Sequence, residues 1–212
     1  MATGSRTKNR AVRAEKSRAT RLRIVAAASE LFAHDGYLQT TMADIARAAD
    51  VAVQTLYLSF GSKVAVLAAA LDIAIAGDDD PIPVIDRPSH ARLRDEPDCA
   101  QALRMFVAAG IEIIERVYPL YAVLRAAAAD PELAELLDRN KRLRFTTYET
   151  VMREMANKTG FDRRLSVRRA TEILYTVVSE ETYGLLVIEH SWTAQDWSEW
   201  AHRSLRAELL TT

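Results

Sequence analysis

Residues 22–67 read LRIVAAASELFAHDGYLQTTMADIARAADVAVQTLYLSFGSKVAVL, and this stretch decides how the chain folds. Its apolar residues from Leu22 to Phe32 recur at about 3.6-residue spacing, which predicts a helix with one buried face. Gly36 follows as the left-handed residue that ends a helix. Phe32 and Tyr37 would then make the apolar contact that accompanies such a stop.

The second part of the stretch predicts two short helices in close succession. Thr41 is followed three residues later by Asp44, the pattern of a capping box, at the start of a helix over residues 42–48. A third helix is expected at about 52–58, after a turn of three residues. A fourth helix, capped by Ser62, continues to Gly77. A short helix, a tight turn and another short helix form a helix-turn-helix unit.

The spacing of these residues resembles the DNA-binding domain of the TetR family of one-component transcriptional repressors. The matching positions are Ala27, Phe32, Gly36, Tyr37, Thr40, Thr41, Ile45, Ala46, Val51, Thr55, Leu56, Tyr57, Phe60, Ser62 and Lys63. Two positions depart from the family pattern. Asp50 stands where the turn usually carries Gly, and aspartate tolerates the left-handed conformation. Ala52 stands where Ser or Thr usually caps the third helix, so that cap is lost.

The resemblance implies that the third helix enters the major groove of DNA. Gln54 has the amide that pairs with adenine, while Val53 and Thr55 suit a thymine methyl group or a phosphate. The resemblance also implies that Tyr57 contacts a phosphate. A core aromatic and an ordinary surface lysine are the alternatives for Tyr57 and Lys63. The predicted DNA-binding residues are Thr40, Thr41, Val53, Gln54, Thr55, Tyr57 and Lys63.

Charge is balanced over the chain and unbalanced along it. The sequence has 28 basic and 29 acidic side chains, yet residues 1–23 contain eight basic side chains and one acidic one. Residues 1–19 are therefore expected to be a flexible basic arm that binds nucleic acid, with a solvated tail as the alternative.

Turn residues divide the rest of the chain. Residues 77–97 contain GDDDP and three further prolines, which predicts a linker between a DNA-binding domain at 20–76 and a helical domain at 98–212. The aspartate run lacks calcium-loop spacing. Helices are expected at about 98–117, 120–129, 131–157, 166–189 and 193–210. The fold class is all-α: an N-terminal three-helix helix-turn-helix domain and a C-terminal ligand-binding and dimerisation domain, about nine helices in all.

The resemblance implies two roles for the C-terminal domain. Its last two long helices would form a dimer interface, and the helices at about 98–160 would enclose a small-molecule pocket. The predicted interface residues are Leu174, Val178, Leu186, Trp192, Trp197 and Trp200. The predicted pocket residues are Phe106, Tyr121, Arg125, Tyr148, Met152, Glu181 and Tyr183. Core packing is the alternative for both sets.

Other functional classes lack their signatures. The sequence has no P-loop, GxSxG, GxGxxG or HExxH motif, and its four histidines lack metal-ligand spacing. Its single cysteine excludes an internal disulfide, and no apolar run approaches the roughly 18 residues of a membrane span. We therefore expect a cytoplasmic, non-enzymatic regulator without cofactor or metal. It would bind a palindromic operator as a homodimer, respond to an unidentified small molecule and, by the resemblance, act as a repressor. The alternative is a helical scaffold with a nonspecific nucleic-acid-binding arm.

Overall fold

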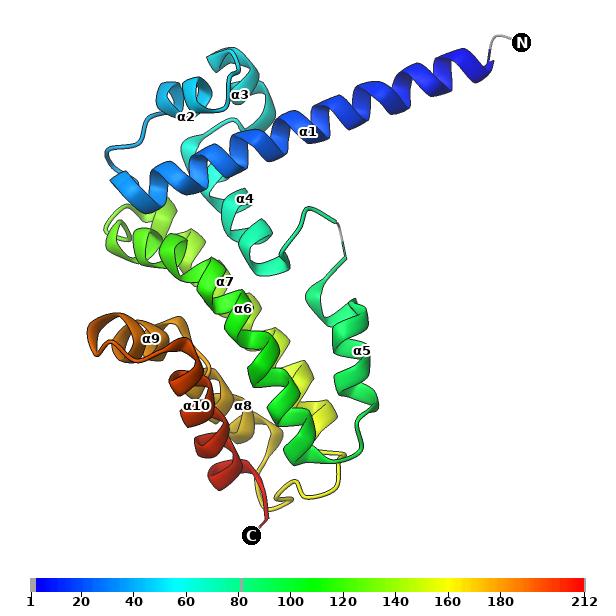
Figure 1. The fold of residues 1–212 in the computed structure, drawn as a ribbon, viewed down its shortest axis with the longest axis vertical. Helices are drawn as coiled ribbons and strands as arrows, with labels where there is room; N and C mark the ends of the chain where they lie inside the picture. Colours follow the sequence, from blue (N-terminus) through cyan, green and yellow to red (C-terminus); the bar gives the residue numbers. More distant parts are fainter. Residues whose placement is uncertain (1–2, 81, 212) are drawn as a thin grey trace.

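The computed structural model describes residues 3–80 and 82–211, and every regular element in these ranges is a helix (Figure 1). The predicted all-α class is confirmed. The DNA-binding part contains α1 (Thr3–Asp35), α2 (Met42–Ala48), α3 (Val53–Phe60) and α4 (Lys63–Ala76). After it come a 3-10 turn η1 (Val84–Asp86), α5 (Pro88–Asp95), α6 (Cys99–Ala126), α7 (Pro131–Met155), α8 (Val167–Val177), α9 (Glu180–Tyr183), the π-helix η2 (Gly184–Glu189) and α10 (Ala194–Leu209).

The ends of the first two helices follow from the sequence. Gly36 is left-handed, with φ of 82°, and its N–H donates to the Phe32 carbonyl at 3.0 Å. The rings of Phe32 and Tyr37 stack with centroids 5.6 Å apart, as the helix stop predicts. Thr41 and Asp44 form the predicted capping box at the start of α2.

The N-terminal segment differs from the expectation of a flexible arm over residues 1–19. From Thr3 it is part of α1, and this half of the helix projects beyond the other helices of the molecule (Figure 1). Alanine, arginine and lysine are good helix formers, so the basic composition does not oppose a helix. Arg18, in this half, pairs with Asp79 and Asp80 at 2.5 and 2.9 Å.

Three predicted boundaries in the rest of the chain are wrong. The expected loop at 77–97 contains η1 and α5, because Pro88 occupies the first turn of a helix, where its missing N–H costs nothing. The expected break at Pro119 does not occur, and α6 continues through it. The expected helix at 166–189 ends at Val177 and restarts after Ser179, whose hydroxyl accepts from the Thr182 N–H at 3.1 Å.

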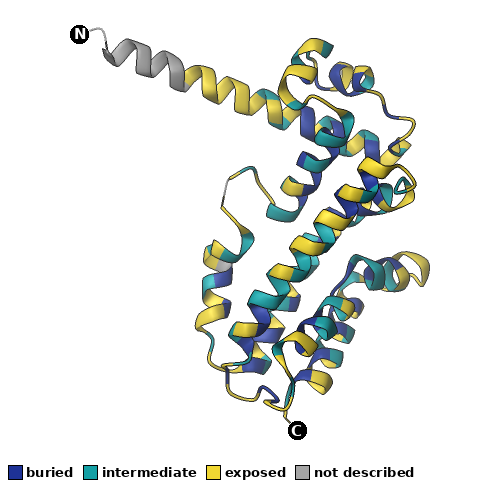
Figure 2. Cartoon of the chain, turned by 180° about the vertical axis from the view of Figure 1, so that it is seen from behind, coloured by how far each residue is buried: buried dark blue, intermediate teal, exposed yellow. Residues whose placement is uncertain are grey.

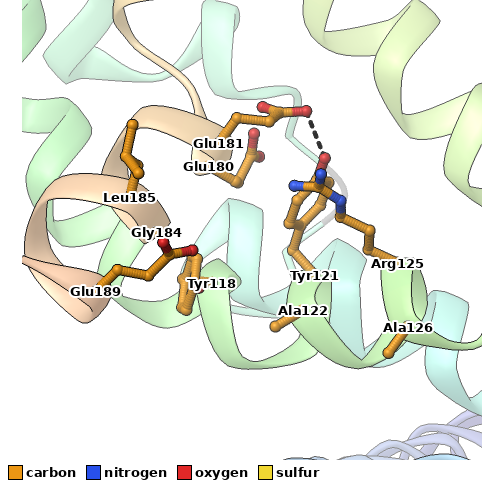
Figure 3. Close-up of a pocket in the computed structure, with 10 residues that line it drawn as sticks. All are labelled: Tyr118, Tyr121, Ala122, Arg125, Ala126, Glu180, Glu181, Gly184, Leu185 and Glu189. Atoms are coloured by element: carbon orange, nitrogen blue, oxygen red, sulfur yellow. Dashed lines mark hydrogen bonds between the residues drawn. The ribbon is translucent and has the colours of Figure 1, made fainter.

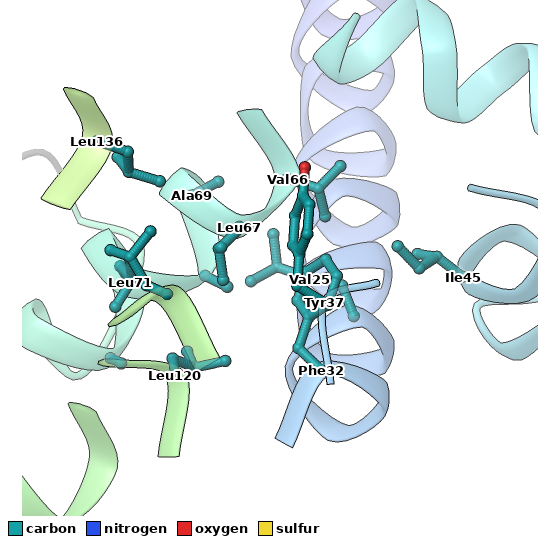
Figure 4. Packing of buried hydrophobic residues seen from close by; sticks show 14 of the residues in the cluster. Val25, Phe32, Tyr37, Ile45, Val66, Leu67, Ala69, Leu71, Leu120 and Leu136 are labelled. Carbon is teal, nitrogen blue, oxygen red and sulfur yellow. The ribbon is translucent and has the colours of Figure 1, made fainter. Parts of the chain in front are cut away.

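Two clusters of buried apolar side chains form the core. The first joins α1, α2, α3 and α4, and it also takes in residues of α6 and α7. In it Leu120 and Leu136 lie beside Leu67 and Leu71 of α4 (Figure 4). The second cluster joins the N-terminal half of α6 with α7, α8 and α10. The packing of the DNA-binding part therefore crosses the domain division expected at residues 77–97.

No single helix among the described residues is long and apolar enough to cross a membrane. The helices α3 and α4 pass that test only as a pair, which is bent by 69°. Most of the α4 side chains are buried or half-buried against neighbouring helices.

Candidate nucleic-acid interface and ligand pocket

Helix α3 has one face in the core and one face in solvent. Leu56 is fully buried and Phe60 is half-buried, so this side holds α3 against the other helices. Gln54, Tyr57 and Leu58 are exposed; Tyr57 is 51% and Leu58 90% accessible. Of the α3 side chains predicted to meet DNA, Gln54 and Tyr57 therefore lie on the free face, while Val53 and Thr55 are half-buried.

The turn before α3 has the geometry expected from its unusual residues. Asp50 adopts a left-handed conformation, with φ of 52°, in the place where Gly would be the ordinary choice. Ala52 is the N-cap of α3 and makes no side-chain cap hydrogen bond. The first N–H groups of α3 therefore lack a hydroxyl partner at the cap.

Two of the predicted DNA-contacting residues serve the interior instead. Thr40 is 1% exposed, and its hydroxyl donates to the Gly36 carbonyl at 2.9 Å. The Lys63 ammonium donates to the carbonyls of Tyr37 and Thr40, both at 2.8 Å. Partial burial lowers the pKa of Lys63. Lys63 therefore holds the loop between α1 and α2, whereas the sequence pattern placed it among the DNA-binding residues.

A basic residue that sequence reasoning did not single out lies at the other end of α3. Arg21 donates to the Ser59 carbonyl at 3.2 Å, and its guanidinium lies over the Phe60 ring, 4.2 Å from the ring centre. A cation at a helix C-terminus is electrostatically favourable. Arg21 therefore joins α1 to the end of α3. The dense basic charge of α1 was the available signal, but it does not distinguish Arg21 from its neighbours.

A cleft of about 380 Å³ lies between α6 and the segment formed by α9 and η2 (Figure 3). Its lining residues are Tyr118, Tyr121, Ala122, Arg125, Ala126, Glu180, Glu181, Gly184, Leu185 and Glu189. Three of the seven predicted pocket residues, Tyr121, Arg125 and Glu181, are in this set. The cleft has the size of a compact small-molecule site.

Charged groups surround one end of the cleft. The Tyr121 hydroxyl donates to Glu181 at 2.5 Å, and Arg144 pairs with Glu180 and, at 3.4 Å, with Glu181. Burial opposes ionisation of Glu181, yet the Tyr121 hydrogen bond and the Arg144 charge keep its pKa below the ordinary value. Within the described ranges, neither Glu189 nor Arg125 forms an ion pair.

The other end of the cleft is built on a close contact that the sequence did not point out. A Cβ atom at Gly184 would lie 2.7 Å from the Tyr118 hydroxyl, so only glycine lets this ring approach the π-helix. π-helices are rare and often occur at functional sites. The signal available beforehand was a glycine inside a helical pattern, which commonly marks close packing.

The remaining predicted pocket residues are part of the second core. Met152 is fully buried, and the Tyr183 ring packs on Trp197 with centroids 5.6 Å apart. Tyr148 donates to the Val178 carbonyl at 3.1 Å and meets the edge of Phe106. The core alternative holds for all four residues, because each has protein neighbours where a ligand was expected.

The predicted interface residues also divide into two groups. Leu174, Val178 and Trp197 are buried within the single chain, which removes them from a surface contact. Leu186 and Trp200 are half-buried, and Trp192 is 36% exposed. Leu185 and Ile188 of η2 are exposed as well, so this segment presents most of the apolar surface near the C-terminal helices.

Catalytic use of the single thiol is disfavoured by its surroundings. Cys99 is fully buried at the start of α6, and burial raises its pKa to about 11. The thiolate, which is the nucleophilic form, is thus scarce near neutral pH.

Comparison with known proteins agrees with this geometry. Residues 24–70 match the family model described as bacterial regulatory proteins, tetR family. This segment is a TetR-family domain. It covers the end of α1, the helix-turn-helix and the first half of α4, which are the elements that position the free face of α3.

Solved structures resemble the whole chain. FadR of Bacillus subtilis, in complex with stearoyl-CoA, has a TM-score of 0.69 at 19% identity, covering 87% of this chain and 96% of its own. The fatty acid degradation regulator FadR of Bacillus halodurans has a TM-score of 0.69 at 18% identity, with 88% and 94% covered. NalD of Pseudomonas aeruginosa, the secondary repressor of the MexAB-OprM multidrug efflux pump, has a TM-score of 0.65 at 19% identity, with 92% and 98% covered. At these identities the likeness establishes a shared fold: the TetR-family domain continues into the helical architecture of these regulators. A comparison with curated proteins finds no match.

Proposed function

We propose that this chain is a ligand-responsive transcriptional regulator, acting as a repressor, that binds a palindromic operator as a homodimer. One observation carries the proposal: in the TetR-family domain, Leu56 fixes α3 while Gln54, Tyr57 and Leu58 remain free on its outer face. A short helix with a free face of this kind fits the major groove of DNA.

The contacts divide by chemistry into those that select a sequence and those that hold DNA. The Gln54 amide pairs with adenine, and Tyr57 donates to a phosphate. Thr41, exposed at the N-cap of α2, adds a phosphate contact, while Val53 and Thr55 flank Gln54. Thr40 and Lys63 act indirectly, because their internal hydrogen bonds fix the loop that precedes α2.

Dimerisation would cover the exposed apolar side chains of η2. Leu185, Ile188 and Trp192 are exposed within a short segment, next to the half-buried Leu186. To read a palindrome, the dimer must hold its two α3 helices on successive turns of the DNA, about 34 Å apart. Trp200, half-buried on α10, would lie at the edge of the same surface.

Tyr121 is the residue through which a ligand would act on the DNA-binding part. Its ring belongs to the first core, together with Phe32 and Ile45, and the same side chain lines the cleft. A ligand that displaces Tyr121 from Glu181 would shift α6 inside the core that carries α3. Ligands regulate when they bind two conformations with different affinity, and this contact provides such a difference.

The cleft favours a compact organic cation as the effector. Glu180, Glu181 and Glu189 face Arg125 and Arg144, so the five groups sum to one negative charge. Glu189 has no ion pair in the described chain, and Tyr118 lines the same end, so a carboxylate and an aromatic ring can share a cation. FadR of Bacillus subtilis is seen with stearoyl-CoA. An acyl-CoA carries several negative phosphates, which the glutamates here would repel.

DNA selection from a random duplex library tests the core of the proposal. We expect the selection to enrich a palindromic sequence and footprinting to show protection of both of its half-sites. Light scattering should give the mass of a dimer. Binding that falls steeply with salt without any sequence preference would instead support the nonspecific scaffold, which the projecting basic half of α1 makes the second candidate.

The effector class is tested with probes of equal chain length: octyltrimethylammonium, octanoate and 1-octanol. We expect the cation to raise the melting temperature most and to weaken operator binding, since a ligand of the folded state stabilises it. Glu189→Gln should remove this preference, while Glu112→Gln, an exposed change on α6 outside the cleft, should keep it. An equal or larger effect of octanoate would contradict the cation assignment.

A further inference from the structure

The side chain of Leu58 is unusually exposed for its type. It is 90% accessible, the highest value among the large apolar side chains that the structure describes. On the free face of α3, Gln54 and Ser59 are exposed and polar, whereas Tyr57 is 51% accessible, so Leu58 and Tyr57 are the large apolar side chains that this face presents, and Leu58 is the aliphatic one. Keeping such a group in water forgoes the stabilisation that burial would bring.

Leu58 lies one helical turn after Gln54. Residues four apart share a face of a helix, and the rise of 1.5 Å per residue separates these two by about 6 Å along the axis. This distance corresponds to about two base-pair steps of 3.4 Å. When Gln54 faces the edge of one base pair, Leu58 faces the groove floor about two pairs away.

The major groove offers one kind of apolar group to a leucine there. Thymine carries a C5-methyl group, whereas adenine, guanine and cytosine have no methyl group on that edge and present mainly hydrogen-bonding atoms. We propose that Leu58 reads a thymine methyl group, so that each operator half-site has an adenine opposite Gln54 and a thymine about two pairs from it. This inference rests on the proposed function, because it requires α3 to lie in the groove.

The experiment removes the methyl group without changing base pairing. In the operator obtained by selection, each thymine is replaced in turn by uracil, and the affinity of the full chain is measured. Burial of one methyl group stabilises by about 0.8 kcal/mol, so we expect about a fourfold loss at one position of each half-site. Cytosine at that position should also weaken binding, and 5-methylcytosine should recover part of the loss.

Variants of the two most exposed leucines assign the effect. Leu58→Ala should bind the thymine and uracil operators equally. Leu38→Ala, which changes a 77% exposed leucine outside α3, should keep the fourfold discrimination. Both sites are exposed, so folding should be unaffected, and melting curves check this. The uracil series on the unaltered chain needs no variant at all.

The outcomes separate the two claims. Sequence-specific binding that is indifferent to every thymine methyl group, or a discrimination that survives in Leu58→Ala, overturns the role of Leu58 and leaves the regulator intact. Absence of any sequence preference overturns the proposed function and this inference together.

Discussion

Helix α3 has one clearly buried and one clearly exposed face, whereas the C-terminal helix α10 has no such sharp division. In α3, Leu56 is fully buried and Leu58 is almost fully exposed, so two positions separate a packing role from a surface role. In α10, Trp197 is fully buried and Trp200, one turn later, is only half-buried. A helix packed on one side divides cleanly into faces, whereas a helix with neighbours on several sides does not.

This difference explains why the exposed residues of α3 could be predicted from the sequence while the pocket and interface residues of the C-terminal helices could not. The free face of α3 follows from helical periodicity alone, because only one direction leads to the core. Around α8 and α10 the same periodicity marks an apolar side without saying which helix covers it. The sequence therefore left two interpretations open for each residue: pocket or core for Tyr148 and Met152, and dimer interface or core for Trp197.

The largest effect is expected when the stability of Trp197→Ala is compared with that of Trp200→Ala. Removing Trp197 leaves a cavity in the second core and frees Thr182 Oγ1 from its 3.2 Å hydrogen bond, so we expect about 3–5 kcal/mol lower stability. Trp200→Ala should cost clearly less folding stability and act mainly on dimer dissociation. Chemical denaturation measures the first effect and dilution series measure the second. Equal losses of folding stability would remove the contrast.

The second test separates sequence selection from general affinity on α3. Gln54→Ala should relax selectivity at one base pair, costing about 1–3 kcal/mol on the preferred operator only. Tyr57→Phe, which removes one hydroxyl, should weaken binding to all sequences by a similar factor. Competition assays with a panel of operator variants distinguish the two patterns. If Tyr57→Phe binds every duplex normally, Tyr57 has no phosphate contact.

The third test concerns Tyr121, which belongs to the first core and also lines the cleft. Tyr121→Phe removes the hydroxyl that donates to Glu181 and leaves the ring in the first core. We expect a loss of about 1–3 kcal/mol, because a half-buried carboxylate loses a partner. Operator affinity should change as well, whereas Tyr148→Phe, which removes a hydrogen bond within the second core, should lower stability without that change. Matched melting curves and DNA titrations check both.

The smallest effect is expected at the capping box of α2. Thr41→Ala should cost about 1 kcal/mol. The Thr41 hydrogen bonds and Arg47 hold the pKa of Asp44 below 3.8, so its contribution is complete above that pH and is lost as the pH falls through the folded value. Asp44→Asn should therefore flatten the acid side of the stability profile of this domain. An unchanged profile in Asp44→Asn would show that the box adds nothing.

The sequence predicted the DNA-binding part closely and the rest only in outline. The stop at Gly36, the box at Thr41 and the left-handed Asp50 are local features, set by hydrogen bonds between near neighbours. The internal hydrogen bonds of Thr40 and Lys63 were not predicted, because their partners belong to the folded loop between α1 and α2. The sequence predicts that Lys63 lies at the start of a helix, but the partners of its ammonium group depend on the tertiary fold.

The C-terminal errors have a similar origin. Pro119 usually ends a helix, yet the packing of Val117 and Leu120 on both sides keeps α6 continuous. The helix restarts through the Ser179 cap, and the π-helix at Gly184 packs closely against Tyr118, which approaches from α6. Such contacts between distant segments leave no periodic pattern in the sequence, so seven of the ten residues that line the cleft were not predicted.

The shared first core also limits how this protein can be cut or recombined. A fragment that stops at Gly77 would leave Leu67 and Leu71 of α4 without the cover of Leu120 and Leu136, and several apolar side chains would face water. Figure 2 shows the chain from behind, coloured by burial. A transfer of the DNA-binding part, α1 to α4, to another regulator would therefore have to include the halves of α6 and α7 that pack against it. Engineering of chimeric sensors from this scaffold should place the junction within α7, after Leu137, so that the buried α6 and α7 residues of the first core stay with α4.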